Sequence, residues 1–125
     1  MPMTDGTKNY LAQAIRGEAI TPFNNANAYI GVGNSSAGFD GSHTDLQGTS
    51  VRRGMRPGYP SRNDNVLIYT ARFEEEVANF NWNEAGIFND SSGGVMLNRL
   101  IDAMGNKTSS EIWDLEITLT ILRGT

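Results

Sequence analysis

The chain has 125 residues, no cysteine, a net charge of −4 at pH 7 and a sequence pI near 4.8. This length suits one domain, so we expect a single domain over residues 1–125. The missing cysteines exclude disulfides and thiolate metal sites, and the acidic balance argues against general nucleic-acid binding, which needs a basic surface. The start resembles no secretory signal, and no apolar run approaches about 20 residues, so we expect a soluble product made in the cytoplasm, without a membrane span.

Residues 7–16 show the one helical pattern of the chain. Thr7 is the expected N-cap, and Gly17 stands where a helix commonly ends. The apolar stripe of this helix consists of Tyr10, Leu11, Ala14 and Ile15. A helix this short is not stable alone in water, so it must dock on a sheet or on a neighbouring subunit.

Three segments of the middle of the chain have distinct characters. Residues 28–33 are predicted as the first strand, and residues 34–48 as a long polar loop, of the kind that is often functional or mobile. Residues 51–62 hold four of the ten basic residues and no acid, and their prolines and glycines predict irregular structure. Residues 65–73 alternate in polarity and predict a strand.

A β-hairpin is the strongest feature of the second half. Its predicted arms are residues 85–88 and 95–100, and a strand is expected to begin near Val77. The turn between the arms contains Asn89, Asp90, Gly93 and Gly94, and these glycines reach positive φ without steric cost. Residues 102–109 are predicted as a loop.

The final strand, residues 112–121, alternates apolar and polar side chains. Its apolar face supplies the first core candidates, which are Trp113, Leu115, Ile117, Leu119 and Ile121. Together these patterns predict a mainly β protein of six or seven strands. We expect an antiparallel β-sandwich or flattened barrel with one short N-terminal helix.

Two groups of loop residues contain residue types that could carry chemistry, but the sequence signal of each group is weak. Ser42, His43 and Asp45 contain the residue types of a catalytic triad, but triads are assembled from distant segments. Asp40, Asp45 and Asp64 offer oxygen ligands for Ca²⁺ without the spacing of an EF-hand loop. Solvated loop side chains are the better interpretation of both groups, and we expect no cofactor and no metal.

Glu84 lies inside an apolar hairpin arm, which allows two interpretations. It is either a general acid or base with a raised pKa, or a carboxylate satisfied by backbone N–H groups or by an arginine such as Arg99. The second is favoured, because no second carboxylate stands at catalytic spacing. Gly31 and Gly33 resemble part of a dinucleotide fingerprint, but the third glycine and the following helix are missing.

Aromatic and basic residues suggest two kinds of binding surface. A sugar-stacking platform would use aromatics, namely Trp82, Trp113, Tyr29, Tyr59 and Phe80, although Trp113 and Phe80 are better assigned to the core. Residues 52–62 combine arginines with an aromatic, which is the composition of a protein interface and equally of a solvated loop. The candidate partner-binding residues are Arg52, Arg53, Arg56, Tyr59 and Arg62.

Several blocks of the chain, taken in order, resemble small structural proteins of tailed bacteriophages. They are Asn-Glu-Ala-Gly-Ile-Phe-Asn at 83–89, Ser-Gly-Gly-Val-Met-Leu-Asn-Arg at 92–99, Lys-Thr at 107–108 and the alternating final strand. Ala-Tyr-Ile-Gly-Val-Gly at 28–33 and Asp-Leu at 45–46 extend the likeness, which covers about residues 9–122. Such proteins are similar to capsid decoration (cement) proteins and to connector domains of tail-collar fibres.

The resemblance implies a binding role in the virion and no enzymatic activity. The expected partner is the major capsid protein, bound at the outer surface of the shell, with a homotrimer as the expected assembly. A tail or tail-fibre component is the first alternative, and a carbohydrate-binding module is the second. Neither nucleic acid nor a membrane is expected as a partner.

Overall fold

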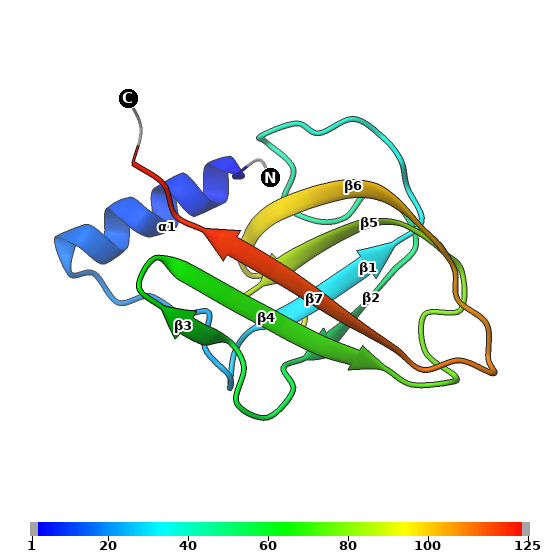
Figure 1. The fold of residues 1–125 in the computed structure, drawn as a ribbon. Helices are drawn as coiled ribbons and strands as arrows, with labels where there is room; N and C mark the ends of the chain where they lie inside the picture. The colour runs from blue at the N-terminus through cyan, green and yellow to red at the C-terminus, as the bar shows by residue number, and fades with distance from the viewer. Residues whose placement is uncertain (1–2, 124–125) are drawn as a thin grey trace.

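The structure, a computed structural model, describes residues 3–123. Within these residues, one helix precedes seven strands (Figure 1). The elements are α1 (Asp5–Arg16), β1 (Tyr29–Gly33), β2 (Ser50–Gly54), β3 (Ser61–Asn63), β4 (Val66–Phe73), β5 (Asn81–Phe88), β6 (Met96–Asn106) and β7 (Trp113–Thr120).

Two antiparallel sheets pack face to face, in the manner of a β-sandwich. The four-stranded sheet has the order β2-β1-β5-β6, and the three-stranded sheet has the order β3-β4-β7. The core between them includes Ile30 and Ile87, which are register partners in β1 and β5, and Tyr69, Ala71 and Phe73 of β4. The predicted mainly β architecture is confirmed, and the sheets remain separate instead of closing into a barrel.

The predicted helix is present but begins earlier than expected. Thr4, not Thr7, is the N-cap, because its side chain accepts a hydrogen bond from the Thr7 backbone N–H. The Thr7 side chain is buried and donates to the carbonyl oxygens of Met96 (3.1 Å) and Leu97 (3.0 Å), which fastens α1 to β6. Gly17 ends the helix with φ of 85°, as its position predicts.

The hairpin of β5 and β6 is confirmed. Gly93 and Gly94 have φ of 61° and 68°, a region that residues with a side chain rarely adopt. The Asn89 side chain closes the turn, because its Oδ1 accepts from the Val95 N–H at 2.7 Å. The long connection at residues 34–48 contains no helix or strand, as predicted.

The prediction of irregular structure for residues 51–62 is wrong in part. β2 pairs with β1 over five residues, and β3 pairs with the start of β4. The prolines and glycines that suggested irregularity fall mainly between these strands, at residues 54–60. Pairing with a neighbouring strand overrides a weak local preference.

Two boundaries in the second half also differ from the prediction. Residues 74–80 turn instead of starting a strand, because Ala78 has a positive φ of 57° and the Val77 N–H bonds the Glu74 carbonyl. Residues 102–106 belong to β6 instead of a loop, since Asn106 and Gly105 pair with Asn81 and Trp82. β6 is therefore a long strand that continues beyond the predicted hairpin arm.

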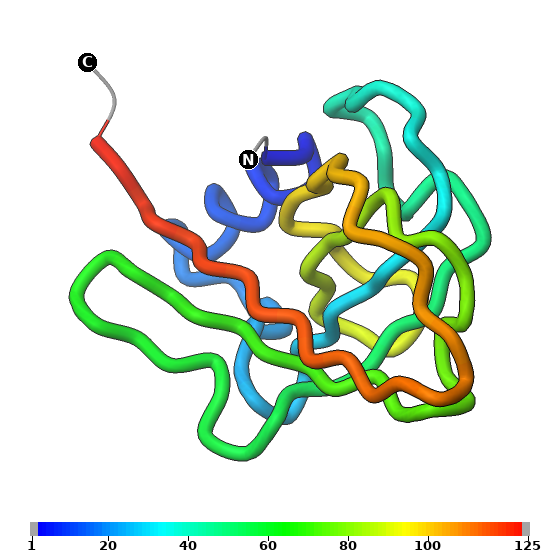
Figure 2. The backbone as a smooth tube through the Cα atoms, turned by 45° about the vertical axis from the view of Figure 1, so that its right-hand side comes forward, coloured from blue at the N-terminus to red at the C-terminus, as the bar shows by residue number. Residues whose placement is uncertain are grey.

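The final strand supplies less of the core than its pattern suggests. Ile117 is buried, but Trp113, Leu115 and Leu119 are half-buried, and Ile121 is 59% exposed. For Leu119 and Ile121 the cause is positional, because the C-terminal end of β7 extends past the part of the sandwich that the opposite sheet covers (Figure 2).

Candidate interaction surface

Arg52 is held within the molecule. Its guanidinium lies 3.5 Å from the centre of the Phe88 ring, and its Nη1 donates to the carbonyl oxygens of Asp90 (2.8 Å) and Gly93 (3.0 Å). Nη2 pairs with Asp45 at 3.3 Å, and the side chain is only 10% exposed. Arg52 therefore fastens the β5–β6 turn to β2, and little of its charge reaches the surface.

Arg53 and Arg56 lie in a mixed cluster of charges. Arg53 pairs with Glu74 at 3.4 Å, while Arg72 of β4 binds both carboxylate oxygens of Asp114 of β7, at 2.8 and 3.0 Å. The hydrogen bond from Arg72 holds the pKa of Asp114 below its usual value, and the positive charge of Arg56 adds to this effect. The predicted basic segment thus meets acids from the three-stranded sheet and its neighbouring turn.

Tyr59 and Arg62 complete the predicted set but lie farther along the chain. Tyr59 is half-buried, and its carbonyl oxygen accepts from the Asn25 side chain at 2.6 Å. Arg62 is exposed in β3 and donates to the Asp64 carbonyl oxygen. Arg52 and Arg53 are neighbours in β2, and their side chains leave opposite faces of the sheet. The five residues therefore do not form one continuous patch.

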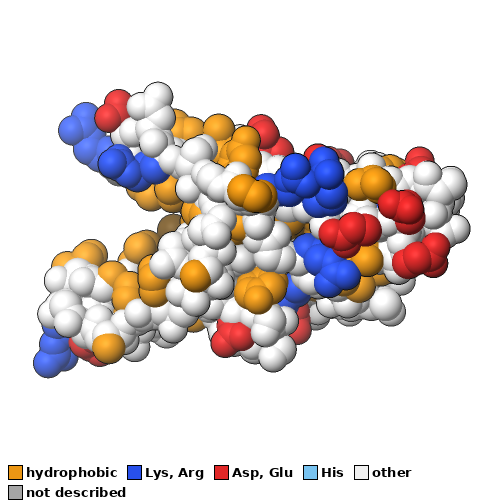
Figure 3. All heavy atoms as spheres, turned by 90° about the horizontal axis from the view of Figure 1, so that it is seen from below, with side chains coloured by type: hydrophobic (Ala, Val, Ile, Leu, Met, Phe, Trp, Pro, Cys, Tyr) orange, Lys and Arg blue, Asp and Glu red, His pale blue; other side chains and the backbone are white. Residues whose placement is uncertain are grey.

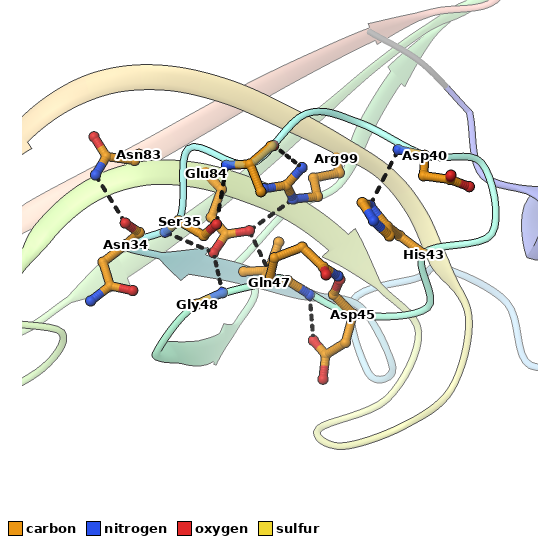
Figure 4. Close-up of polar contacts among 12 residues, drawn as sticks. Asn34, Ser35, Asp40, His43, Asp45, Gln47, Gly48, Asn83, Glu84 and Arg99 are labelled. Carbon is orange, nitrogen blue, oxygen red and sulfur yellow. Dashed lines mark hydrogen bonds and ion pairs between the residues drawn. The ribbon is translucent and has the colours of Figure 1, made fainter.

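Glu84 and Arg99 form a fully buried ion pair that anchors the 34–48 loop (Figure 4). Glu84 Oε1 accepts from Arg99 Nε and from the Gln47 N–H, both at 2.8 Å. Oε2 accepts from the N–H groups of Gly48 (2.8 Å) and Ser35 (3.1 Å). Arg99 in turn donates to the carbonyl oxygen of Ala37.

The electrostatics of this pair contradict a raised pKa for Glu84. Burial alone would raise its pKa, but the hydrogen bonds from Gln47, Arg99, Gly48 and Ser35 outweigh burial and lower it. The carboxylate is therefore ionised at neutral pH and has no free lone pair directed at solvent. The interpretation of Glu84 as a satisfied structural carboxylate is the one that the geometry supports.

Gly33 leaves the space that the Glu84 carboxylate fills. A methyl group at Gly33 would overlap the Glu84 carboxylate, and one at Gly31 would lie 2.8 Å from the Phe88 ring. Both glycines lie within β1, and irregular chain follows them instead of a helix. Close packing explains these residues without a phosphate.

The loop residues considered for catalysis or metal binding have local partners. The Ser42 hydroxyl donates to Asp40 Oδ1 at 2.7 Å, not to His43, whose Nδ1 accepts from the Asp40 N–H. Asp45 accepts from the Leu46 N–H and from Arg52. Among residues 3–123, no three histidine or acidic side chains are grouped closely enough to hold a metal ion.

The aromatic residues pack against one another instead of presenting a flat surface. Trp82 is buried, and its ring meets those of Phe73 and Trp113 edge to face, each at a centroid distance of 4.9 Å. Its Nε1 donates to the Ala78 carbonyl oxygen. Phe80 packs on the same core, and Tyr29 packs on a smaller cluster with Phe88.

Lys107 is a third buried charged residue, which the sequence analysis placed only within a block of the resemblance and assigned no role. Its Nζ donates to the carbonyl oxygens of Glu74 (2.7 Å) and Glu75 (3.3 Å) and to the Asn79 side chain (2.9 Å). Its N–H also donates to the Phe80 carbonyl oxygen. Lys107 therefore ties the β6–β7 connection to the 74–80 turn.

An apolar cleft lies between α1, β6 and the C-terminal end of β7. Its volume is about 260 Å³. It is lined by Met3, Thr7, Leu11, Leu97, Asn98, Leu119, Thr120, Ile121 and Leu122. At the side where Figure 1 places α1 and the β3–β4 turn, the molecule is hollowed, with hydrophobic side chains on both walls (Figure 3).

The rim of this cleft exposes large apolar side chains. Among the residues that line the cleft, Leu122 is 78% exposed, Ile121 59% and Leu11 44%. Ile15, one turn after Leu11 in α1, is 88% exposed. Leu11 and Ile15 belong to the predicted apolar stripe of the helix, which the sequence analysis expects to dock on a sheet or on a neighbouring subunit. The sequence analysis did not predict the cleft, because it assigned the whole apolar face of the final strand, Leu119 and Ile121 included, to the core.

No helix within residues 3–123 is long and apolar enough to cross a membrane. No protein-family model matches the chain, and no curated protein matches it.

Proposed function

We propose that the chain is a structural protein of a tailed-phage virion, and specifically a capsid decoration protein that binds the outer surface of the major capsid shell. On this proposal it acts by binding and performs no catalysis. The resemblance of residues 83–89 and 92–99 to phage structural proteins motivates the proposal.

The observation that carries the proposal is the exposed apolar rim of the cleft. Soluble monomers seldom leave large apolar side chains grouped in water, and such groups mark interaction sites. Here Ile15, Ile121 and Leu122 are each more than half exposed in a chain of 125 residues. A protein that works as a repeated subunit has neighbours that cover such a surface.

Anchored loops also suit this role. The 34–48 loop is held by Glu84 and Arg99, and the 74–80 turn by Lys107. A subunit on a shell under internal pressure gains from many modest contacts between rigid copies, because each copy need bind only weakly when neighbours act together.

The test is the copy number and location of the chain in purified particles of the phage that encodes it. A decoration protein is expected in hundreds of copies on the outer shell, by quantitative gel staining and cryo-EM. A small multiple of three or six copies, placed at the tail, would refute decoration and assign the chain to the tail. Its absence from particles would refute a virion role altogether.

A further inference from the structure

The strand β7 is an open edge of the three-stranded sheet. Among the strands of residues 3–123, its only neighbour is β4, with an unbroken register from Trp113 to Thr120. Beyond the strand, the Ile121 N–H donates to the Asn65 carbonyl oxygen at 2.9 Å, which fixes the alternation of the ladder. The backbone N–H and C=O groups of the even-numbered residues therefore point outward, away from β4.

The edges at β2 and β3 are short, and the longer edge at β6 is irregular. β3 has three residues and β2 has five. β6 has two register shifts against β5, and Met3 bridges to Asn98 on this strand. By contrast, β7 has eight residues, no bulge against β4, and no proline, lysine or arginine, which are the usual means of blocking an edge.

The C-terminal half of the β7 edge opens beside the apolar cleft. Leu119, Thr120, Ile121 and Leu122 form one wall of the cleft, and α1 and β6 form the other. Ile121 still bonds to Asn65, and after it the chain leaves the sheet (Figure 2). An added strand here gains backbone hydrogen bonds and covers exposed Ile121 at the same time.

We propose that a second copy of this chain pairs its β7 antiparallel with β7 about a two-fold axis, centred in the C-terminal half of the strand. The proposal goes beyond the proposed function and does not depend on capsid binding. Because the contact is isologous, it produces pairs of chains, in place of the ring of three that the resemblance implies.

The charged side chains of β7 favour one register of pairing with a second copy of the strand. Asp114 and Glu116 lie in the first half of the outward-facing row, and Thr118 and Thr120 lie in the second half. Pairing centred on Glu116 would set Glu116 against Glu116 of the second copy, which is unfavourable. Pairing centred on Leu119 sets Thr118 against Thr120 of the second copy, in both directions, and keeps the acids apart.

The same register matches the apolar face. Ile117 of one copy then lies opposite Ile121 of the other, and the two Leu119 side chains meet at the axis. Each copy thus supplies the apolar end that covers the cleft of the other. This reciprocity favours a second copy over an unrelated partner, because one strand carries both halves of the complementary surface.

The experiment uses two charge variants of the full chain, Thr118→Lys with Thr120→Lys, and Thr118→Glu with Thr120→Glu. Both side chains are exposed, so the core is unchanged. Light scattering after gel filtration is expected to give twice 13.6 kDa for the unaltered chain, 13.6 kDa for each variant, and twice 13.6 kDa for their equimolar mixture. The matched control, Ser91→Lys with Ser92→Lys in the exposed hairpin turn, is expected to keep the double mass.

A mass of one chain, or of three, for the unaltered protein over its soluble concentration range would overturn the proposal. So would a double mass for either variant alone, or a mixture that stays single. Hydrogen exchange on the unaltered chain gives a readout that needs no variant. On raising the concentration, the N–H groups of Thr118 and Thr120 are expected to gain protection, and equal exchange at low and high concentration would count against the contact.

Discussion

Replacing Glu84 by glutamine tests whether the buried ion pair holds the 34–48 loop in place. The change keeps the shape of the side chain and removes its charge, which leaves Arg99 buried with 0% side-chain exposure and no counter-ion. Breaking a buried pair from one side costs roughly 3–5 kcal/mol. We therefore expect Glu84→Gln to lower the free energy of unfolding by about that amount.

The corresponding melting temperature follows from chain length. Unfolding entropy is about 2.1 cal/mol/K per residue, or roughly 0.26 kcal/mol/K for 125 residues. The expected fall in Tm is therefore about 11–19 °C. It is measured by thermal melting and by urea unfolding, with the intrinsic fluorescence of Trp82 and Trp113 as the signal.

Arg72→Met is the matched control, because it breaks the pair with Asp114 whose side chains are 41% and 43% exposed. Exposed pairs contribute only about 0.2–1 kcal/mol, so this variant is expected to lose less than about 4 °C. Equal losses in Glu84→Gln and Arg72→Met would refute the reasoning, since burial would then make no difference.

Three further predictions concern the pKa of Glu84, the space at Gly33 and the arginines of β2 and the turn that follows it. The pKa of Glu84 is lower in the folded state, so its contribution to stability is present above the unfolded pKa of about 4.3 and is lost as pH falls through the folded value. The urea midpoint of Glu84→Gln should therefore depend less on pH below that point than the midpoint of the unaltered chain. Parallel curves of urea midpoint against pH for the two proteins would contradict this. Gly33→Ala should destabilise by about 1–3 kcal/mol through overlap with the Glu84 carboxylate, and an unchanged urea midpoint would show that the carboxylate can move aside. If residues 53–56 contact the shell, Arg53→Glu with Arg56→Glu should release the chain from capsids in a sedimentation assay while leaving it folded. Arg52→Glu, by contrast, should unfold the chain by removing the contacts over Phe88. Full capsid occupancy of the first variant would place the contact elsewhere.

The elements that the sequence predicted well are those with a strong local signal. The alternation of β4 and β7, and the turn with Gly93 and Gly94, depend on residues near one another in the chain, and the structure has all three. The strand β2 and the extension of β6 were not predicted, because these segments become strands by pairing with the backbones of β1 and β5. Local composition carries no record of such long-range pairing.

The candidate interaction residues were harder to predict for a related reason. Four arginines in residues 52–62 read as one basic patch, but neighbouring strand residues face opposite sides, and Glu74 and Asp114 arrive from other elements. Whether a charge is exposed depends on partners that the sequence does not place. The favoured interpretation of Glu84, with Arg99 as its partner, is confirmed, because a carboxylate in apolar surroundings needs a partner nearby.

The anchored loops and the apolar cleft differ in how their polar and apolar groups are satisfied, and this difference indicates where assembly takes place. In the 34–48 loop and the 74–80 turn, the buried charges of Glu84 and Lys107 are each bonded to backbone groups, which makes local opening costly. At the α1 end, Ile121 and Leu122 remain in water beside an edge strand with outward N–H and C=O groups. Association gains most where surface is still uncovered, so contacts between subunits should form at the α1 end and leave the anchored loops unchanged.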